Sequence, residues 1–214
     1  MLKKKYKYAI IGMGAMGNEH YQNLQLLENV EVVAICDNYD KSLQNFSKSN
    51  NEKIKIFNNH LDLISENPAD VYIIATPNHT HLNLLKDLIK TNSHLMIEKP
   101  LCTNVKDCFD LKRWTSNYSG MIWTAMEYRY MPPVKKFISD IKLGKIGEIK
   151  MLSIREHRFP FLKKVRDWNR FEKNTGGTLV EKCCHFFDLM RLILESEAVR
   201  VYASGNQDVN HLDE

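Results

Sequence analysis

The chain has 214 residues, enough for one large domain or two small ones. Hydrophobic residues make up 43% and charged residues 26% of it, which excludes the disordered and fibrous classes. Thirty Lys+Arg against 26 Asp+Glu give a net charge of +4 without a long block of one sign, so we expect no nucleic-acid partner. No run approaches the roughly 18–20 apolar residues that span a bilayer, and five cysteines without an export signal indicate reduced thiols. We therefore expect a soluble, cytoplasmic protein with no membrane partner.

The first hundred residues alternate between short apolar runs and segments with helical spacing. The predicted strands are 6–11, 31–36, 54–57, 71–75 and 95–97, and the predicted helices are 15–27, 41–47, 61–66 and 81–90. Apolar strands that alternate with helices are typical of a parallel sheet covered on both faces. The sequence therefore predicts the α/β class, with a doubly wound parallel sheet of the Rossmann type.

The pattern changes after Pro100. It predicts helices at 105–114, 134–143 and 178–194, strands at 121–126, 147–159 and 199–203, a polar loop at 163–175 and a polar tail at 205–214. The domain boundary is placed at 118–128, giving a first domain of 1–122 and a second of 123–214. We expect the second to be a partial α/β (α+β) domain with an open sheet.

A glycine-rich loop follows the first predicted strand and opens the first helix. Its sequence is Gly12-Met13-Gly14-Ala15-Met16-Gly17. The first glycine makes a tight turn, the second lets the backbone approach a pyrophosphate, and the third allows close packing of helix and strand. The helix N-terminus offers N–H groups and a positive dipole end to phosphates. A glycine-rich turn without a ligand is the alternative interpretation.

Asp37 closes the second predicted strand, 20 residues after Gly17. A carboxylate at this position accepts hydrogen bonds from both ribose hydroxyls and repels a 2′-phosphate, which favours NAD over NADP. Lys41 lies one helical turn further on, so tolerance of NADP stays open. The sequence predicts NAD as the cofactor of the first domain. Its predicted cofactor-binding residues in this segment are Gly12, Gly14, Ala15, Met16, Gly17 and Asp37.

Three further motifs occur in a fixed order after this loop. They are Ala75-Thr76-Pro77-Asn78-His79-Thr80-His81, Glu98-Lys99-Pro100 and Gly176-Gly177-Thr178-Leu179-Val180-Glu181-Lys182-Cys183-Cys184-His185-Phe186-Phe187-Asp188. With the glycine loop, they make nearly the whole chain resemble the Gfo/Idh/MocA oxidoreductase family, which includes inositol dehydrogenase and many sugar dehydrogenases. The resemblance implies a Rossmann domain followed by an α/β domain whose open sheet mediates homo-oligomerisation.

Lys99 stands at the carboxyl end of a predicted parallel strand, where open α/β sheets place ligands. A lysine there can hydrogen-bond a substrate oxygen and stabilise its developing negative charge. A surface lysine in a turn before proline is the plain alternative. The resemblance makes Lys99 the catalytic lysine and a cofactor contact, and Glu98 a neighbour of the nicotinamide ribose. It also brings four residues beneath the nicotinamide end of the cofactor: Thr76, Pro77, Asn78 and His81.

The predicted helix 178–194 brings Glu181 and His185, four positions apart, onto one face. The resemblance gives His185 the position of the family's catalytic histidine. Glu181 stands where the family usually has aspartate, so Glu181 binds the sugar or only orients His185. A packed core histidine beside Phe186 and Phe187 is the alternative interpretation.

Polar and aromatic side chains in the second domain suit a polyol, because sugar C–H faces stack on tryptophan while hydroxyls need hydrogen-bond partners. The substrate-binding candidates are Arg129, Arg158, Trp168, Asn169, Glu181 and His185. The arginines equally suit an acidic sugar, and a solvated loop explains each residue as well. We expect no metal, because the consecutive helical residues Cys183-Cys184-His185 point about 100° apart and cannot share one ion.

These features predict an NAD-dependent enzyme that transfers a hydride between a sugar, sugar-acid or cyclitol hydroxyl and the nicotinamide. An NAD-dependent glycoside hydrolase with transient oxidation and a non-catalytic nucleotide sensor are the alternatives. The second domain has fewer than 100 residues, less than the resemblance implies. We therefore expect either a fragment or completion by another chain, with association or aggregation through the open sheet.

Overall fold

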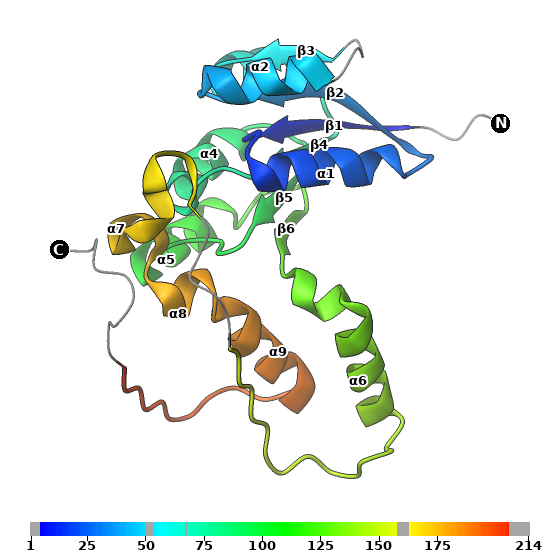
Figure 1. The fold of residues 1–214 in the computed structure, drawn as a ribbon, viewed down its shortest axis with the longest axis vertical. Coiled ribbons are helices and arrows are strands. Elements are labelled where there is room, and N and C mark those ends of the chain that lie inside the picture. Colours follow the sequence, from blue (N-terminus) through cyan, green and yellow to red (C-terminus); the bar gives the residue numbers. More distant parts are fainter. Residues whose placement is uncertain (1–4, 50–53, 67, 158–162, 206–214) are drawn as a thin grey trace. The chain divides into compact units, whose positions relative to one another are not determined.

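The computed structural model describes residues 5–49, 54–66, 68–157 and 163–205. The chain forms two compact units, Met1–Ala125 and Met126–Glu214, and each is described by itself. Figure 1 shows the elements of both units along the chain.

The first unit is built on a six-stranded sheet in which every neighbouring pair is parallel. Its strands are β1 (Tyr6–Ile11), β2 (Val30–Cys36), β3 (Lys55–Phe57), β4 (Val71–Ile74), β5 (His94–Glu98) and β6 (Ile122–Ala125), in the order β3-β2-β1-β4-β5-β6. The strand order reverses at β1, since β2 lies on one side of it and β4 on the other (Figure 1). Open parallel sheets bind ligands outside the carboxyl ends of their strands at such a reversal.

Helices cover both faces of this sheet, as the alternating sequence pattern predicts. They are α1 (Ala15–Gln25), α2 (Asp40–Ser49), α3 (His60–Glu66), α4 (His81–Leu88) and α5 (Val105–Trp114). Side chains of a strand point alternately to opposite faces. Ile10 of β1 packs in one apolar cluster with Tyr21 of α1 and Phe46 of α2. Its neighbour Ile11 packs in the other cluster with Leu85 of α4, together with residues of α3 and α5. The predicted doubly wound Rossmann sheet is confirmed.

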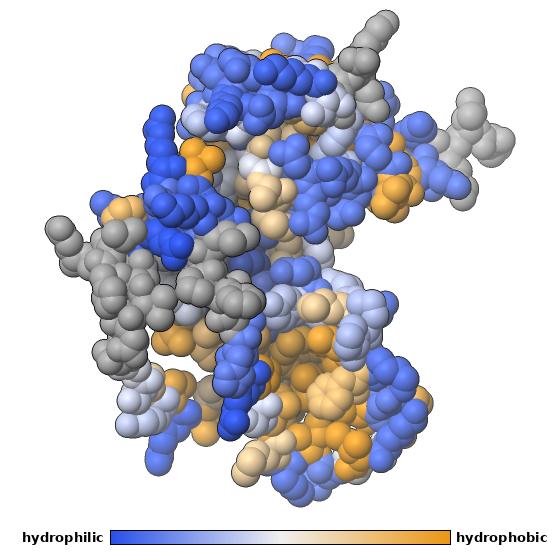
Figure 2. Space-filling model, viewed as in Figure 1, coloured by the Kyte–Doolittle hydropathy of each residue, from blue (hydrophilic) through white to orange (hydrophobic). Residues whose placement is uncertain are grey.

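The described residues of the second unit form short helices. They are the 3-10 helices η2 (Glu127–Tyr130) and η3 (Val165–Arg170), and the α-helices α6 (Pro132–Lys142), α7 (Glu172–Thr175), α8 (Thr178–Glu181) and α9 (Cys184–Leu194). The predicted loop 163–175 is thus wrong in part, since it contains η3 and α7. Figure 2 shows apolar side chains gathered over α6 and α9, where Phe137 and Phe187 are exposed.

Two predicted strands of the second unit are wrong. Residues 147–157 and 199–203 have no strand, and 158–159 lie outside the described residues. A strand needs a neighbour that pairs with its backbone N–H and C=O groups. In the described part of the second unit no strand offers this pairing, and Met151, Val199, Val201 and Tyr202 are exposed.

The predicted helix 178–194 is interrupted. The N–H groups of Lys182 and Cys183 both donate to the carbonyl of Thr178, and the N–H of His185 donates to the carbonyl of Lys182. The N–H of Lys182 still makes an i→i−4 bond, but the N–H of Cys183 reaches back five residues and that of His185 only three, so the regular ladder is lost between α8 and α9. No glycine or proline at this point announces the break in the sequence. No helix in the described part of the chain is both long and apolar enough to cross a membrane.

Candidate functional site

The three loop glycines have three different environments. A Cβ on Gly12, whose φ is +96°, would lie 2.6 Å from the carbonyl oxygen of Ala75. A Cβ on Gly17 would lie 1.8 Å from the carbonyl oxygen of Gly12. A Cβ on Gly14, by contrast, would meet no atom within 4 Å. The protein's own backbone thus requires glycine at 12 and 17, while Gly14 leaves open space at the N-terminus of α1, where N–H groups point outward.

Asp37 is tied to the glycine loop. Its Oδ2 accepts a hydrogen bond from the N–H of Met13 at 2.7 Å, and its Oδ1 accepts one from the N–H of Tyr39 at 2.8 Å. Each carboxylate oxygen has further lone pairs for a ligand hydroxyl. Burial, followed by the nearby charges of Asp37 and Asp62, raises the pKa of the neighbouring Cys36 thiol to about 12.

Asn18, on α1, stabilises the glycine loop through hydrogen bonds, a role that the sequence analysis missed. Its Nδ2 donates to the carbonyl oxygens of Met13 and Gly14, both at 2.8 Å. Ala15 and Met16, the other two loop candidates, lie in the first turn of α1 beside Gly14. A polar residue soon after the last loop glycine is the signal that could have found Asn18.

The segment that follows β4 approaches the loop at Ala75 and contains a buried donor. Thr76 and Thr80 share a hydrogen bond between their hydroxyls at 2.6 Å. Pro77 precedes the 3-10 helix η1 (Asn78–Thr80), in which Asn78 is 6% exposed. Its Nδ2 has no hydrogen-bond partner among the described residues. Because buried amide groups are rarely left unsatisfied, this donor marks a place for a ligand acceptor.

His81 is fully buried and bridges two segments. Its Nδ1 lies 2.9 Å from the carbonyl oxygen of Pro100, and its Nε2 lies 3.0 Å from that of Thr76. Burial lowers the pKa of His81, and the two backbone carbonyls oppose that effect. Both ring nitrogens therefore face protein backbone, and the neutral imidazole, which has one N–H, donates it to one of the two carbonyls.

The Glu98-Lys99-Pro100 motif lies at the carboxyl end of β5. Glu98 is the last residue of this strand, and its Oε1 lies 2.7 Å from the Nε2 of His20 on α1. Lys99 follows half-buried, and the peptide bond to Pro100 is cis. Side-chain contacts thus connect the motif to α1 through His20 and to the segment of Thr76 through His81. The cofactor candidates of the first unit gather at one edge of the sheet.

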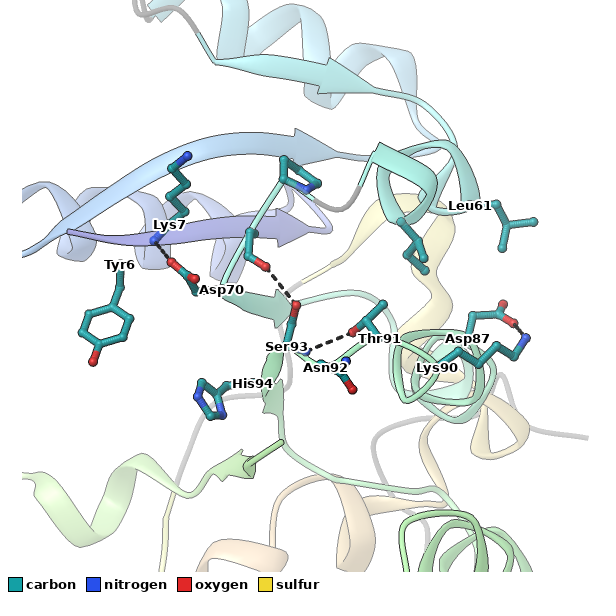
Figure 3. A pocket seen from close by; sticks show the side chains of 13 residues that line it. Tyr6, Lys7, Leu61, Asp70, Asp87, Lys90, Thr91, Asn92, Ser93 and His94 are labelled. Carbon is teal, nitrogen blue, oxygen red and sulfur yellow. Dashed lines mark hydrogen bonds and ion pairs between the residues drawn. The ribbon is translucent and has the colours of Figure 1, made fainter. Parts of the chain in front are cut away.

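A separate pocket lies at the opposite, amino-terminal edge of the same sheet. Figure 3 shows it among Lys7, Asp70, Ser93 and His94, and its volume is about 740 Å³. The N–H of Lys7 donates to Asp70 Oδ2 at 2.8 Å, and the hydroxyl of Ser93 donates to the carbonyl of Ala69 at 2.9 Å. These polar groups hold the turns before β4 and β5 in place, and none of the candidate residues lines this pocket.

In the second unit, His185 on α9 is 1% exposed and stacks on an aromatic ring. Its ring lies 4.1 Å from that of Tyr128, centroid to centroid, with an angle of 7° between the planes. Its Nε2 lies 3.2 Å from Oε1 of Glu127. The hydroxyl of Tyr128 accepts a hydrogen bond from Lys182, whose ammonium also lies 3.3 Å from Glu156. The sequence analysis gave Tyr128 and Lys182 no individual role, because their contacts join residues that are distant in the sequence.

The interrupted helix corrects the expectation for Glu181. Glu181 ends α8 and His185 belongs to α9, so the two residues do not share one face of a continuous helix. The loss of the i→i−4 ladder between them removes the geometry on which that expectation depended.

Of the substrate candidates, Arg129 has a charged partner. Its Nε donates to Asp188 Oδ2 at 2.5 Å, and its Nη2 donates to the other carboxylate oxygen. This hydrogen bonding raises the pKa of the Arg129 guanidinium. Trp168 is half-buried and Asn169 is buried, both in η3, while Arg158 lies outside the described residues. The described residues contain no group of three or more His, Cys, Asp and Glu that could hold a metal ion.

Two domain families match this chain. Residues 6–125 match the oxidoreductase family described as the NAD-binding Rossmann fold, and residues 138–214 match its C-terminal alpha/beta domain. An uncharacterized oxidoreductase, YrbE, of Bacillus subtilis is 25% identical over 98% of this chain and 60% of its own length. The myo-inositol 2-dehydrogenase of Thermotoga maritima is 25% identical over 94% of this chain and 58% of its own.

Solved structures show the same fold. An NAD-binding protein from Listeria innocua superposes with a TM-score of 0.80 at 22% identity, over 90% of this chain and 56% of that one. The WlbA dehydrogenase of Bordetella pertussis, in complex with NADH and UDP-GlcNAcA, superposes with a TM-score of 0.78 at 19% identity. This match covers 91% of this chain and 56% of that one. The chain thus spans a little over half the length of these relatives. The match over both domains, on a doubly wound sheet with the glycine loop at its carboxyl edge, means that this chain belongs to the Gfo/Idh/MocA oxidoreductase family.

Proposed function

We propose that this chain is part of an oxidoreductase that transfers a hydride between a sugar, sugar-acid or cyclitol hydroxyl and a nicotinamide cofactor. In this proposal residues 1–122 bind NAD and residues 123–214 belong to the substrate domain. The observation that carries the proposal is the open space over Gly14 at the N-terminus of α1, beside the anchored carboxylate of Asp37.

The residues present fit a dinucleotide. Gly14 leaves room for a pyrophosphate at the positive end of the α1 dipole. The remaining lone pairs of the Asp37 carboxylate accept hydrogen bonds from the hydroxyls of a ribose. Its negative charge repels a 2′-phosphate, so NAD is preferred to NADP. The buried Nδ2 of Asn78 supplies a donor for an acceptor on the nicotinamide half.

A nicotinamide held by these residues would supply the acceptor or donor of the hydride. The ammonium of Lys99 donates a hydrogen bond to the substrate oxygen and stabilises the negative charge that develops there. His185 takes the proton of the hydroxyl, in line with the family's catalytic histidine. A protonated imidazole is stabilised by Glu127, whose Oε1 lies 3.2 Å from His185 Nε2. Glu181 binds the substrate or orients the histidine.

Sugars and polyols are the substrate class that relatives support. Their names include inositol 2-dehydrogenases and a glucose-6-phosphate 3-dehydrogenase. Trp168 offers a ring for sugar C–H groups, and Asn169, Arg129 and Arg158 offer donors for hydroxyls or a carboxylate. Homo-oligomerisation is part of the proposal, because the second unit exposes apolar side chains such as Val201 and Tyr202; light scattering at micromolar concentration tests it.

Two measurements test the proposed function. Calorimetric titration compares NAD with NADP, and tighter binding of NADP contradicts the role given to Asp37. A panel of sugars, sugar acids and polyols is then incubated with NAD and the full-length gene product that contains this chain. Accumulation of NADH supports the dehydrogenase, release of sugar without NADH indicates the glycoside hydrolase, and NAD binding without any turnover indicates the sensor.

A further inference from the structure

Two histidines hold the segment that carries Lys99, and they come from opposite faces of the sheet. His20 lies on α1, which packs in the apolar cluster around Ile10. His81 begins α4, which packs in the other cluster with Ile11. The two rings contact Glu98 and Pro100, the residues on either side of Lys99.

The contact of His20 with Glu98 joins residues 78 positions apart in the sequence. Nε2 and Oε1 are 2.7 Å apart, and the two side chains are only 14% and 10% exposed. A carboxylate so far removed from water needs a hydrogen-bond donor. His20 can supply the proton on Nε2 as a neutral imidazole or as an imidazolium, so the contact persists in both forms.

The contact of His81 with Pro100 fixes the other side. With its proton on Nδ1, the ring, which has no solvent exposure, donates to this backbone carbonyl at 2.9 Å, and Nε2 faces the carbonyl of Thr76 at 3.0 Å. Lys99 is therefore flanked on both sides by residues that a histidine contacts. A side chain on such a segment starts from a defined position, which is what an oriented proton donor requires.

We propose that His20 is a positioning residue: it anchors the Glu98 carboxylate and so fixes the backbone from which Lys99 reaches the substrate. The inference rests on the proposed function. His20 lies outside the glycine loop and the three motifs of the sequence analysis, and its contact with Glu98 assigns it this role. Without the imidazole, Glu98 loses its partner and turns toward solvent or toward Lys99.

The experiment compares His20→Leu, which removes the donor, with His20→Gln, whose amide N–H replaces it. His60→Leu is the matched control, because His60 also pairs with a carboxylate of this unit, Asp87, at 3.1 Å. We expect His20→Leu to lower kcat about tenfold or more, with little change in the substrate KM. His20→Gln should recover kcat to within about threefold of the wild type, and His60→Leu should leave it unchanged.

Unfolding curves give the folded fraction of each variant. A loss of kcat that matches a loss of folded protein overturns the inference, as does an unchanged kcat in His20→Leu or a His20→Gln variant as slow as His20→Leu. A wild-type chain that binds no NAD defeats the proposed function instead. A chain that binds NAD but, as part of an oxidoreductase, turns over no substrate offers no kcat to compare. In that case hydrogen exchange of the peptide containing Lys99 decides: faster exchange in His20→Leu alone supports the anchor, and equal exchange in all variants overturns it.

Discussion

Replacing Gly14 and Gly17 separately by alanine distinguishes a glycine kept for a ligand from one kept for the fold. Gly14 has a φ of −74°, which alanine adopts readily, and a Cβ there meets no atom within 4 Å. We expect Gly14→Ala to leave the free energy of unfolding unchanged or to raise it by about 0.4–1 kcal/mol, because alanine restricts the unfolded chain. The new methyl group fills the space proposed for the pyrophosphate.

A Cβ on Gly17 would lie 1.8 Å from the carbonyl oxygen of Gly12, whereas real Cβ atoms essentially never come closer than 3.0 Å. Either α1 or the loop must therefore move by more than about 1 Å, a backbone shift of the kind that overpacked cores show. Gly17→Ala should lose about 1–3 kcal/mol of stability, or more if the loop cannot move.

Urea unfolding and calorimetric titration with NAD measure the two effects. Gly14→Ala should unfold at the wild-type midpoint or above it and bind NAD about 10- to 100-fold more weakly, a loss of about 1.4–2.8 kcal/mol. Gly17→Ala should unfold at lower urea. Wild-type affinity for NAD in Gly14→Ala would refute the placement of the pyrophosphate, and a wild-type midpoint in Gly17→Ala would refute the packing argument.

Three further predictions concern other side chains. Lys99→Ala and His185→Ala should each reduce turnover about 100-fold or more with NAD affinity nearly unchanged, and wild-type turnover in either removes that residue from the mechanism. Because burial lowers the pKa of His81 from 6.5, the unfolded chain takes up a proton that the folded chain resists. The free energy of unfolding should therefore decline as the pH falls below about 6.5, and equally steep decline in His81→Gln would count against this cause. A disulfide reagent should label the exposed Cys108 in the native protein but label Cys36, with its pKa raised to about 12, only after unfolding; labelling of both at similar rates would disagree.

The first unit was predictable because its signals are local. The apolar run of β1, the glycines that follow it and the carboxylate of Asp37 after β2 all lie within the first 37 residues, in one strand–helix–strand unit. Parallel strands covered on both faces also need continuous apolar runs, such as 71–74, which stand out in a sequence. Helix ends were less certain: the pattern predicted a helix to residue 27, but α1 ends at Gln25 and Leu26 is exposed.

The second unit was predicted less well because its structure depends on distant contacts. The alternation at 147–157 is typical of a strand, but a strand forms only where a partner pairs with it, and the described residues offer none there. The break at Lys182 coincides with the contacts of its ammonium to Tyr128 and Glu156, which lie far away in the sequence. His20 and Lys182 received no role in the sequence analysis for this reason, since the partners of both are distant in the sequence.

In the proposed function, the bond between Asp37 and the amide of Met13 couples cofactor choice to the shape of the loop. Met13 is only 2% exposed. An apolar residue at 37 would remove the acceptor to which the N–H groups of Met13 and Tyr39 donate. A buried donor left in this way costs about 1–3 kcal/mol. A redesign toward NADP must therefore keep an oxygen at 37 for the amide while it introduces a cation for the phosphate. A change of cofactor thus requires substitutions at two positions together, because a single substitution at 37 that removes the oxygen loses stability without providing the cation.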